Sequence, residues 1–208
     1  MSDPINFYRT GKESLYDAAL CIIGAALWAA LIYALANAES QSVWSFVPLA
    51  FYIFSFIIFF VISALLFRAN AMGNMILISQ DQFPHLAEMV RRGAQKLNIQ
   101  VPEAFLYNSN GAFNAFARQI FGRKYLLLTS SIVEGVTDEQ INFVIGHELG
   151  HHAAGHLNFL KYLLRFPARI VPFLHMAYSR QCEYTCDSIG LFVSRDVKHS
   201  CEAIQMLG

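Results

Sequence analysis

Two long uncharged apolar stretches near the N-terminus constrain the fold most strongly. Residues 18–36 and 40–67 contain no Asp, Glu, Lys or Arg. As helices rising 1.5 Å per residue, both are long enough to cross roughly 30 Å of hydrocarbon. A buried core helix and a cleaved signal peptide are the alternatives, but the first stretch is long for a signal and runs almost directly into a second one. We therefore expect two transmembrane helices, at about residues 18–36 and 46–67.

The distribution of charge around these helices predicts their orientation. The linker, residues 37–43, is short, so the helices form a hairpin with both ends on the same side. Arg9 and Lys12 precede the first helix and Arg68 follows the second, whereas the linker carries Glu39 and no basic residue. By the positive-inside rule, both ends of the hairpin lie in the cytoplasm. Residues 1–68 are thus expected to be a membrane anchor in a multi-pass protein.

The remaining residues, 69–208, are mixed in composition and fit one cytoplasmic domain. The 208-residue chain has no net charge and its basic residues are scattered, so nothing indicates a nucleic-acid partner. A cytoplasmic domain keeps its cysteines reduced, and we expect no disulfide. Cys182 and Cys186 are spaced by one helical turn and can in principle bind metal, but two small buried residues are the simpler interpretation.

Periodicity in this domain predicts an α+β fold with a small sheet. Residues 84–99 have the apolar spacing of a helix. Residues 102–118 suggest two short strands around the Asn110–Gly111 turn signal, and residues 123–133 form a compact β run. Thr137 followed by Gln140 is a capping box that begins a further helix.

That further helix carries the motif with the clearest chemistry. His147 and His151 are four residues apart, which places their side chains on one face of the helix, with Cβ atoms about 5–6 Å apart. Glu148 is adjacent to the first histidine. H-E-x-x-H on a helix is the zincin arrangement, in which two histidines hold zinc and the glutamate accepts a proton from water. A chance match with a buried histidine pair is the alternative, but the capping box upstream supports the helix and hence a metal site.

The third zinc ligand is not set by this motif alone. A metzincin needs glycine at position 154 and histidine at position 157, but the chain has Ala154 and Leu157. A glutamate from a later helix is the other solution, and Glu183 is available. Asp187 lies one turn further and can accept the second N–H of a zinc-bound histidine. A solvated helix face is the competing interpretation of these two acids.

Two further histidines follow the motif, and neither is expected to bind the metal. His152 points away from it, and His156 continues the helix about a turn and a half beyond His151. Structural or surface roles are preferred for both. His156 remains a minor candidate for contact with the substrate or with a metal ligand.

Three segments together resemble a known family. The stretches HELGH at 147–151, NAFA at 114–117 and SRQCEYTCD at 179–187 are similar, in order and spacing, to integral-membrane gluzincin peptidases typified by HtpX and the CAAX prenyl endopeptidase. The resemblance implies a zincin-like domain with one Zn²⁺ held by His147, His151 and Glu183, with Glu148 as general base and Asp187 supporting a ligand. It also implies a substrate-binding edge strand made of Asn114, Ala115, Phe116 and Ala117.

The resemblance further implies a function and a location. We expect a membrane-anchored zinc endopeptidase of the bacterial inner membrane that cleaves membrane or membrane-proximal proteins in protein quality control. Its partners would be polypeptide substrates and the lipid bilayer. A zinc-binding membrane scaffold without proteolysis is the alternative, and prenyl-protein processing is a weaker one because two or three spans are too few. Cys186 replaces the family's alanine, and the chain stops about twenty residues after Asp187, so part of a substrate-binding region is expected to be missing or supplied elsewhere.

Residues 157–178 allow two interpretations. HtpX-like proteins can place membrane helices here, but charged residues and prolines interrupt the run. Lys161, Arg165 and Arg169 form a basic stripe at every fourth position beside an apolar face. The segment either lies on the inner membrane surface, attracted to anionic lipid, or is a soluble helix with a solvated basic side.

Overall fold

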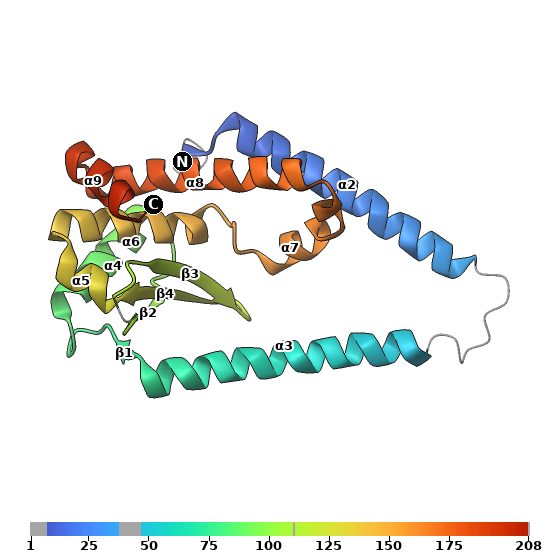
Figure 1. Ribbon diagram of the computed structural model, residues 1–208, viewed down its shortest axis with the longest axis horizontal. Coiled ribbons are helices and arrows are strands. Elements are labelled where there is room, and N and C mark those ends of the chain that lie inside the picture. The colour runs from blue at the N-terminus through green and yellow to red at the C-terminus, as the bar shows by residue number, and fades with distance from the viewer. Residues whose placement is uncertain (1–7, 38–46, 110, 208) are drawn as a thin grey trace.

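Two long helices project from a small α+β domain (Figure 1). The computed structural model describes residues 8–37, 47–109 and 111–207. Helices α2 (Gly11–Ala36) and α3 (Val47–Asn74) are long and apolar enough to cross a membrane, and few of their side chains are buried. The expected linker and Asn110 of the expected turn lie outside the described residues. The prediction of an α+β fold with two N-terminal apolar helices is confirmed.

Both helices are longer than the helices predicted at residues 18–36 and 46–67. Helix α2 begins at Gly11 because the Thr10 side chain accepts a hydrogen bond from the backbone N–H of Glu13, 3.1 Å away. Helix α3 continues past Arg68 to Asn74. The absence of charged residues marks the part of a helix that can contact lipid, whereas backbone hydrogen bonding and capping decide where the helix begins and ends. The division of the chain at residue 68 stays a prediction.

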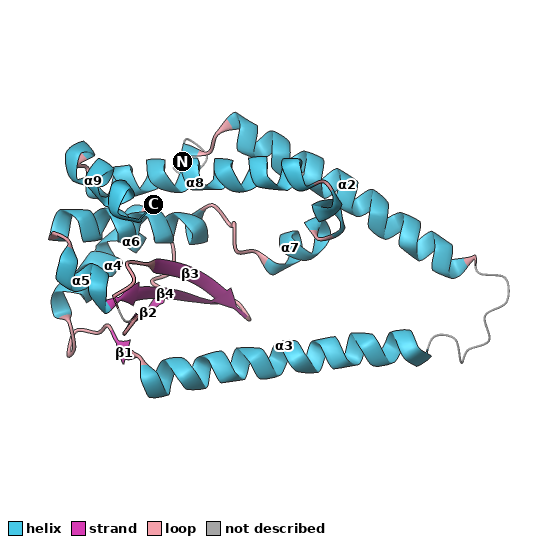
Figure 2. Cartoon of the chain, in the orientation of Figure 1, coloured by secondary structure: helices cyan, strands magenta, loops and turns pink. Residues whose placement is uncertain are grey.

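The sheet has four strands, in the order β1-β2-β4-β3 (Figure 2). The strands are β1 (Ile76–Leu77), β2 (Glu103–Tyr107), β3 (Ala115–Ile120) and β4 (Arg123–Thr129). The strands expected on either side of Asn110–Gly111 exist but do not pair with each other, because β4 lies between them, parallel to β2 and antiparallel to β3. The tight turn is instead Phe121–Gly122, whose φ angles of 46° and 79° are typical of a type I′ hairpin.

The β run ends earlier than expected, and a helix replaces its last residues. The Thr129 hydroxyl accepts a hydrogen bond from the backbone N–H of Ile132, which begins α5 (Ser130–Gly135). Thr137 and Gln140 then form both hydrogen bonds of the predicted capping box and begin α6 (Asp138–Ala153). The short helix α5 therefore turns the chain from the central strand into the helix that carries the histidines.

The two faces of β4 contact different parts of the chain. Leu126 and Leu128 pack into the main core with α6 and with α4 (Pro84–Lys96), whereas Tyr125 and Leu127 face the end of α3. Each fully buried side chain of this kind contributes about 1.5–3 kcal/mol. This packing fixes α6 over the sheet.

Helix α8 (Pro172–Ser194) packs against α6 at unusually close range. A Cβ added to Gly146 would lie 2.7 Å from the Val193 Cβ and 3.1 Å from the Gly190 Cα. A Cβ added to Gly190 would in turn lie 2.9 Å from the Phe143 ring. Paired glycines let the two backbones approach, so side chains that follow Gly146 on α6 can meet side chains that precede Gly190 on α8.

Between α6 and α8 the chain forms α7 (Phe159–Arg165) and the 3-10 helix η2 (Pro167–Ile170), and α9 (Val197–Leu207) follows α8. Lys161 and Arg165 do not form a free basic stripe, as either interpretation of the sequence required. Both bind Asp17 of α2, with Nζ 3.1 Å and a guanidinium nitrogen 2.8 Å from its carboxylate oxygens. These two cations share one carboxylate, so their charge is partly offset within the chain, and Lys161 remains half-exposed. Placement of this segment on the membrane surface stays a prediction.

Candidate active site

The H-E-x-x-H histidines lie side by side at the end of α6. The rings of His147 and His151 are 5.3 Å apart between centroids. The expectation that the helix continues through His156 was wrong: His151 and His152 lie in its last turn, and His156 lies beyond its end. The helix ends at Ala153 because Gly155 takes a φ of 72°, which reverses the chain and returns His156 toward His151.

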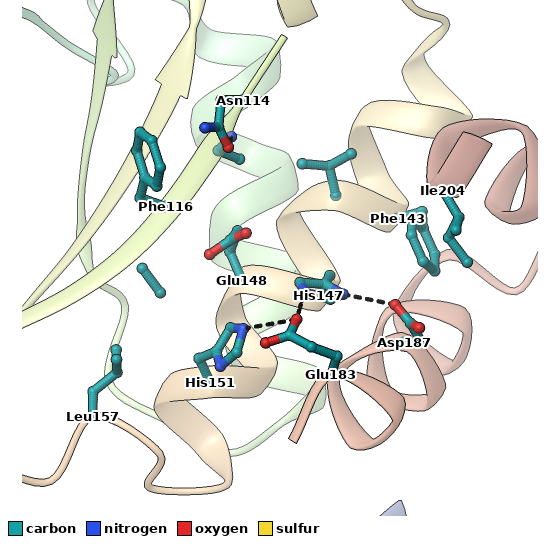
Figure 3. Close-up of a pocket in the computed structure, with 13 residues that line it drawn as sticks. Asn114, Phe116, Phe143, His147, Glu148, His151, Leu157, Glu183, Asp187 and Ile204 are labelled. Carbon is teal, nitrogen blue, oxygen red and sulfur yellow. Dashed lines mark hydrogen bonds and ion pairs between the residues drawn. The ribbon is translucent and has the colours of Figure 1, made fainter. Parts of the chain in front are cut away.

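Glu183 reaches both histidines from α8 (Figure 3). One carboxylate oxygen, Oε2, lies 3.3 Å from His147 Nε2 and 3.8 Å from His151 Nε2. Ligands at 2.0–2.2 Å around a tetrahedral zinc ion lie about 3.4 Å apart, so the two distances from Glu183 are those expected in a zinc site of the two-histidine, one-glutamate type. The residues predicted as ligands are therefore brought together, although their role stays a prediction.

Asp187 orients the first of these histidines. Its Oδ1 lies 3.0 Å from His147 Nδ1, on the opposite side of the ring from Glu183. Burial lowers the pKa of His147, but hydrogen bonds to Asp187 and Glu183 outweigh it and raise the pKa to about 9. With Nδ1–H donated to Asp187, the lone pair of Nε2 faces the position where the metal would bind.

Glu148 occupies the space between α6 and strand β3, and only 9% of it is exposed. Burial raises the pKa of its carboxyl group to about 6, against the opposing effects of His147 and of a hydrogen bond with the Ala117 backbone. Figure 3 shows this carboxylate beside the histidine pair and facing the strand. A carboxyl group in this state is suited to accept and return a proton near neutral pH.

Strand β3 forms the opposite wall, and its outer edge is unpaired by another strand. The Asn114 carbonyl accepts a hydrogen bond from Thr129 N–H, 3.2 Å away, which places Asn114 and Phe116 in the set paired with β4. Paired and unpaired positions alternate along an antiparallel ladder. The main-chain groups of Ala115 and Ala117 therefore point to the free edge, toward α6.

Histidines, acids and strand together line a cavity of about 490 Å³. All nine residues predicted for metal binding, catalysis, support or substrate contact lie on its wall. Sequence reasoning missed the apolar side chains that complete the lining: Phe143, Val144, Leu157 and Ile204. The helical periodicity of α6 could have identified the first two, but nothing in the sequence places Leu157 or Ile204 here.

Cys186 is a second possible ligand, because one ligand atom from each of His147, His151 and Cys186 lies within 4.8 Å of the others. Burial raises the pKa of its thiol well above the usual range, which disfavours the thiolate that binds zinc. Glu183 instead presents an oxygen to both Nε2 atoms and lies in the open cavity. Glu183, and not Cys186, therefore stays the predicted third ligand.

The remaining histidines have defined partners. His152 is buried, and its Nε2 lies 2.9 Å from the Tyr125 carbonyl oxygen, so it points away from the cavity toward the sheet, as expected. His156 Nδ1 lies 3.1 Å from His151 Nδ1, and its Nε2 lies 3.2 Å from a carboxylate oxygen of Glu13. Sequence reasoning did not single out Glu13, which precedes the first apolar stretch and is 2% exposed.

The sequence that carries this site is similar to a known family of peptidases. Residues 80–167 match peptidase family M48. The resemblance found in the sequence is thereby confirmed, and the M48 match supports a metal-dependent peptidase. The match includes His147, Glu148 and His151 but ends before Glu183, so the prediction of that ligand depends on the geometry.

Individual relatives agree with the M48 match. The chain is 29% identical over 140 residues to a plastoglobule-localized metallopeptidase 48 of Arabidopsis thaliana, covering 61% of this chain and 40% of that protein. It is 34% identical over 116 residues to a protease HtpX homolog of Acidovorax ebreus, covering 55% and 37%. A protease HtpX homolog of Archaeoglobus fulgidus is 27% identical over 146 residues, covering 69% and 41%. The chain thus spans about two fifths of the length of these relatives.

Proposed function

We propose that the chain is a membrane-anchored zinc-dependent endopeptidase. The observation that carries this proposal is the convergence of His147 Nε2, His151 Nε2 and Glu183 Oε2 beside the buried carboxyl group of Glu148. A zinc ion held there would polarise the scissile carbonyl group and acidify a water molecule. These groups are what peptide hydrolysis needs, and no observation on the described residues favours a scaffold without proteolysis.

Glu148 moves the proton in this scheme. Its carboxylate accepts a proton from the attacking water and then delivers it to the nitrogen of the leaving amine. The raised pKa of about 6 keeps the deprotonated form abundant at neutral pH while allowing the return step. Asp187 holds the His147 ring in the orientation that directs Nε2 to the metal.

The substrate would bind as an extended strand along β3. The main-chain groups of Ala115 and Ala117 on the free edge can pair with a peptide backbone, as in β-strand addition. In the free chain the Ala115 N–H donates to Asn114 Oδ1 at 2.9 Å and the Ala117 N–H to the Glu148 carboxylate, so a bound substrate would replace these two contacts. A peptide bound in this way lies between β3 and α6, which brings a scissile bond close to Glu148. Main-chain pairing imposes little sequence preference, so specificity would come from the side chains that line the cavity.

A second cavity, of about 550 Å³, supports the proposal that the substrates come from the membrane or its surface. Ala117 and Leu157 line both cavities, so the two adjoin. The far wall of the second cavity is made by α3, with Phe60 packed 5.5 Å from Phe121 and 5.2 Å from Phe159 between ring centroids. Since α3 is itself a candidate membrane span, apolar substrate segments leaving the bilayer can reach this site. We further propose a bacterial inner-membrane location, a cytoplasmic site and a role in protein quality control.

Cleavage of an unstructured protein such as casein by the purified chain tests this function. Glu148→Gln should retain zinc and lose cleavage, because the amide cannot accept the proton. Metal content separates the two candidate ligands: Glu183→Ala should lose zinc, and Cys186→Ala should keep it. Full cleavage by the Glu148→Gln protein would refute the role given to that residue.

A further inference from the structure

A buried carboxylate from the first apolar helix lies two hydrogen bonds away from the zinc site. Glu13 is in the first turn of α2, and 2% of it is exposed. Its Oε1 accepts a hydrogen bond from His156 Nε2 at 3.2 Å. On the other side of that ring, His156 Nδ1 lies 3.1 Å from Nδ1 of the proposed ligand His151.

The Glu13 carboxylate determines which groups donate and which accept in the hydrogen bonds that join Glu13, His156 and His151. An ionised carboxylate only accepts, so His156 donates from Nε2, and in the neutral imidazole this leaves Nδ1 as an acceptor. His151 then donates from Nδ1, and the lone pair of its Nε2 is directed to the metal. Cys186 Sγ lies 3.6 Å from the same His156 nitrogen, but it is a weaker donor than the imidazole N–H.

Other groups hold Glu13 in this orientation. Its second carboxylate oxygen accepts a hydrogen bond from the Thr185 hydroxyl of α8. Arg9 Nε lies 3.0 Å from Oε1, and a further Arg9 nitrogen donates to the Ala154 carbonyl at the end of α6. Leu20 and Gly24 bury the same side of α2, and a Cβ on Gly24 would lie 2.1 Å from the Leu164 carbonyl oxygen. This side of α2 therefore docks closely on the domain.

We propose that Glu13 is a positioning residue for the zinc site, acting through His156 to orient His151. His151 thereby has the counterpart of the Asp187 contact to His147, but its carboxylate comes from the membrane helix and not from the peptidase domain. The proposal rests on the zinc site of the proposed function. It makes α2 part of the metal centre as well as an anchor.

Zinc affinity of the full chain in detergent, measured by competition with a chelator, tests this role. Loss of a carboxylate that orients a metal-bound histidine typically costs about 10- to 100-fold in affinity. Glu13→Gln and His156→Phe should each show such a loss. Because both act through one chain of hydrogen bonds, the double variant should bind zinc no more weakly than His156→Phe alone. Cobalt in place of zinc should show a changed visible spectrum in both variants.

Asp17→Asn is the matched control. It removes a carboxylate one turn further along α2 that pairs with Lys161 and Arg165 but does not contact His156. Zinc affinity within about threefold of wild type is expected for this variant. An equal loss in Asp17→Asn, additive losses in the double variant, or unchanged affinity in Glu13→Gln would overturn the proposal. If the wild-type chain bound no zinc, the proposed function itself would fail, and this positioning role with it.

Discussion

The contact between α6 and α8 determines whether Glu183 can meet the two histidines, and Gly146 is its closest point. Replacing this glycine by alanine adds a methyl group 2.7 Å from the Val193 Cβ, 3.1 Å from the Gly190 Cα and 3.2 Å from the Gly190 carbonyl oxygen. None of these atoms is the free end of a flexible side chain. The helices must therefore separate by several tenths of an ångström.

The magnitude follows from two opposing effects. Overpacking of a close-packed core costs about 1–3 kcal/mol. Alanine is favoured over glycine within a helix by about 1 kcal/mol. Since the clash involves backbone and Cβ atoms, we expect a net loss of about 1–2 kcal/mol, together with weaker zinc binding as Glu183 moves away from His147. In a chain of this size, such a loss lowers Tm by about 2–8 °C.

Thermal unfolding of the full chain in detergent, with and without zinc, measures both effects. Gly150→Ala is a control on the same helix: its new methyl group would lie 3.3 Å from the Cys186 Cα, a tight but less severe contact, so a change near zero is expected. Gly73→Ala on α3 meets no atom within 4 Å and should stabilise slightly. A Gly146→Ala protein as stable as wild type, with unchanged zinc affinity, would show that the close approach of α6 and α8 does not determine the position of Glu183 relative to the histidines.

Three further predictions concern the site and the helix that carries it. In urea unfolding of chelator-treated protein, Glu148→Gln should be more stable than wild type by about 2 kcal/mol above pH 7 and equal to it near pH 4. The pKa of the Glu148 carboxyl group is about 6 in the folded state, against 4.5, so the group destabilises the folded state only when it ionises. A stability difference that is constant between pH 4 and pH 7 would contradict this cause. Asp187→Ala should weaken zinc binding by about 10- to 100-fold in chelator competition, through lost orientation of His147, and unchanged binding would count against it. Thr137→Ala removes the cap of α6 and should cost about 1 kcal/mol in thermal unfolding, whereas Thr137→Ser should be nearly neutral.

Local signals predicted the parts of the site that lie within one element. The spacing of His147 and His151 placed both side chains on one helix face, and the Thr137 capping box located the start of that helix. Asp187 was expected to support a histidine because it lies one turn from Glu183. These inferences needed only helical geometry, which the structure of α6 and α8 reproduces.

Predictions failed where a longer-range contact decided the structure. His156 was expected to continue the helix, but the positive φ of Gly155 ends it and turns the ring toward His151. The Asn110–Gly111 signal suggested adjacent strands, yet β4 pairs with both because its side chains fill the core on each face of the sheet. Arg165 was expected at lipid or water, but it is buried and paired with Asp17, which also binds the partly exposed Lys161.

The sequence by itself determined the two apolar helices, the α+β class and the histidine pair, because hydrophobic length and periodicity act over a few neighbouring residues. Only the tertiary structure decided which atoms surround the metal position. Glu183 meets the histidines because glycines let α6 and α8 approach, and Glu13 reaches His156 because α2 docks beside them. Such contacts join residues distant in the chain, and their geometry depends on how whole elements pack.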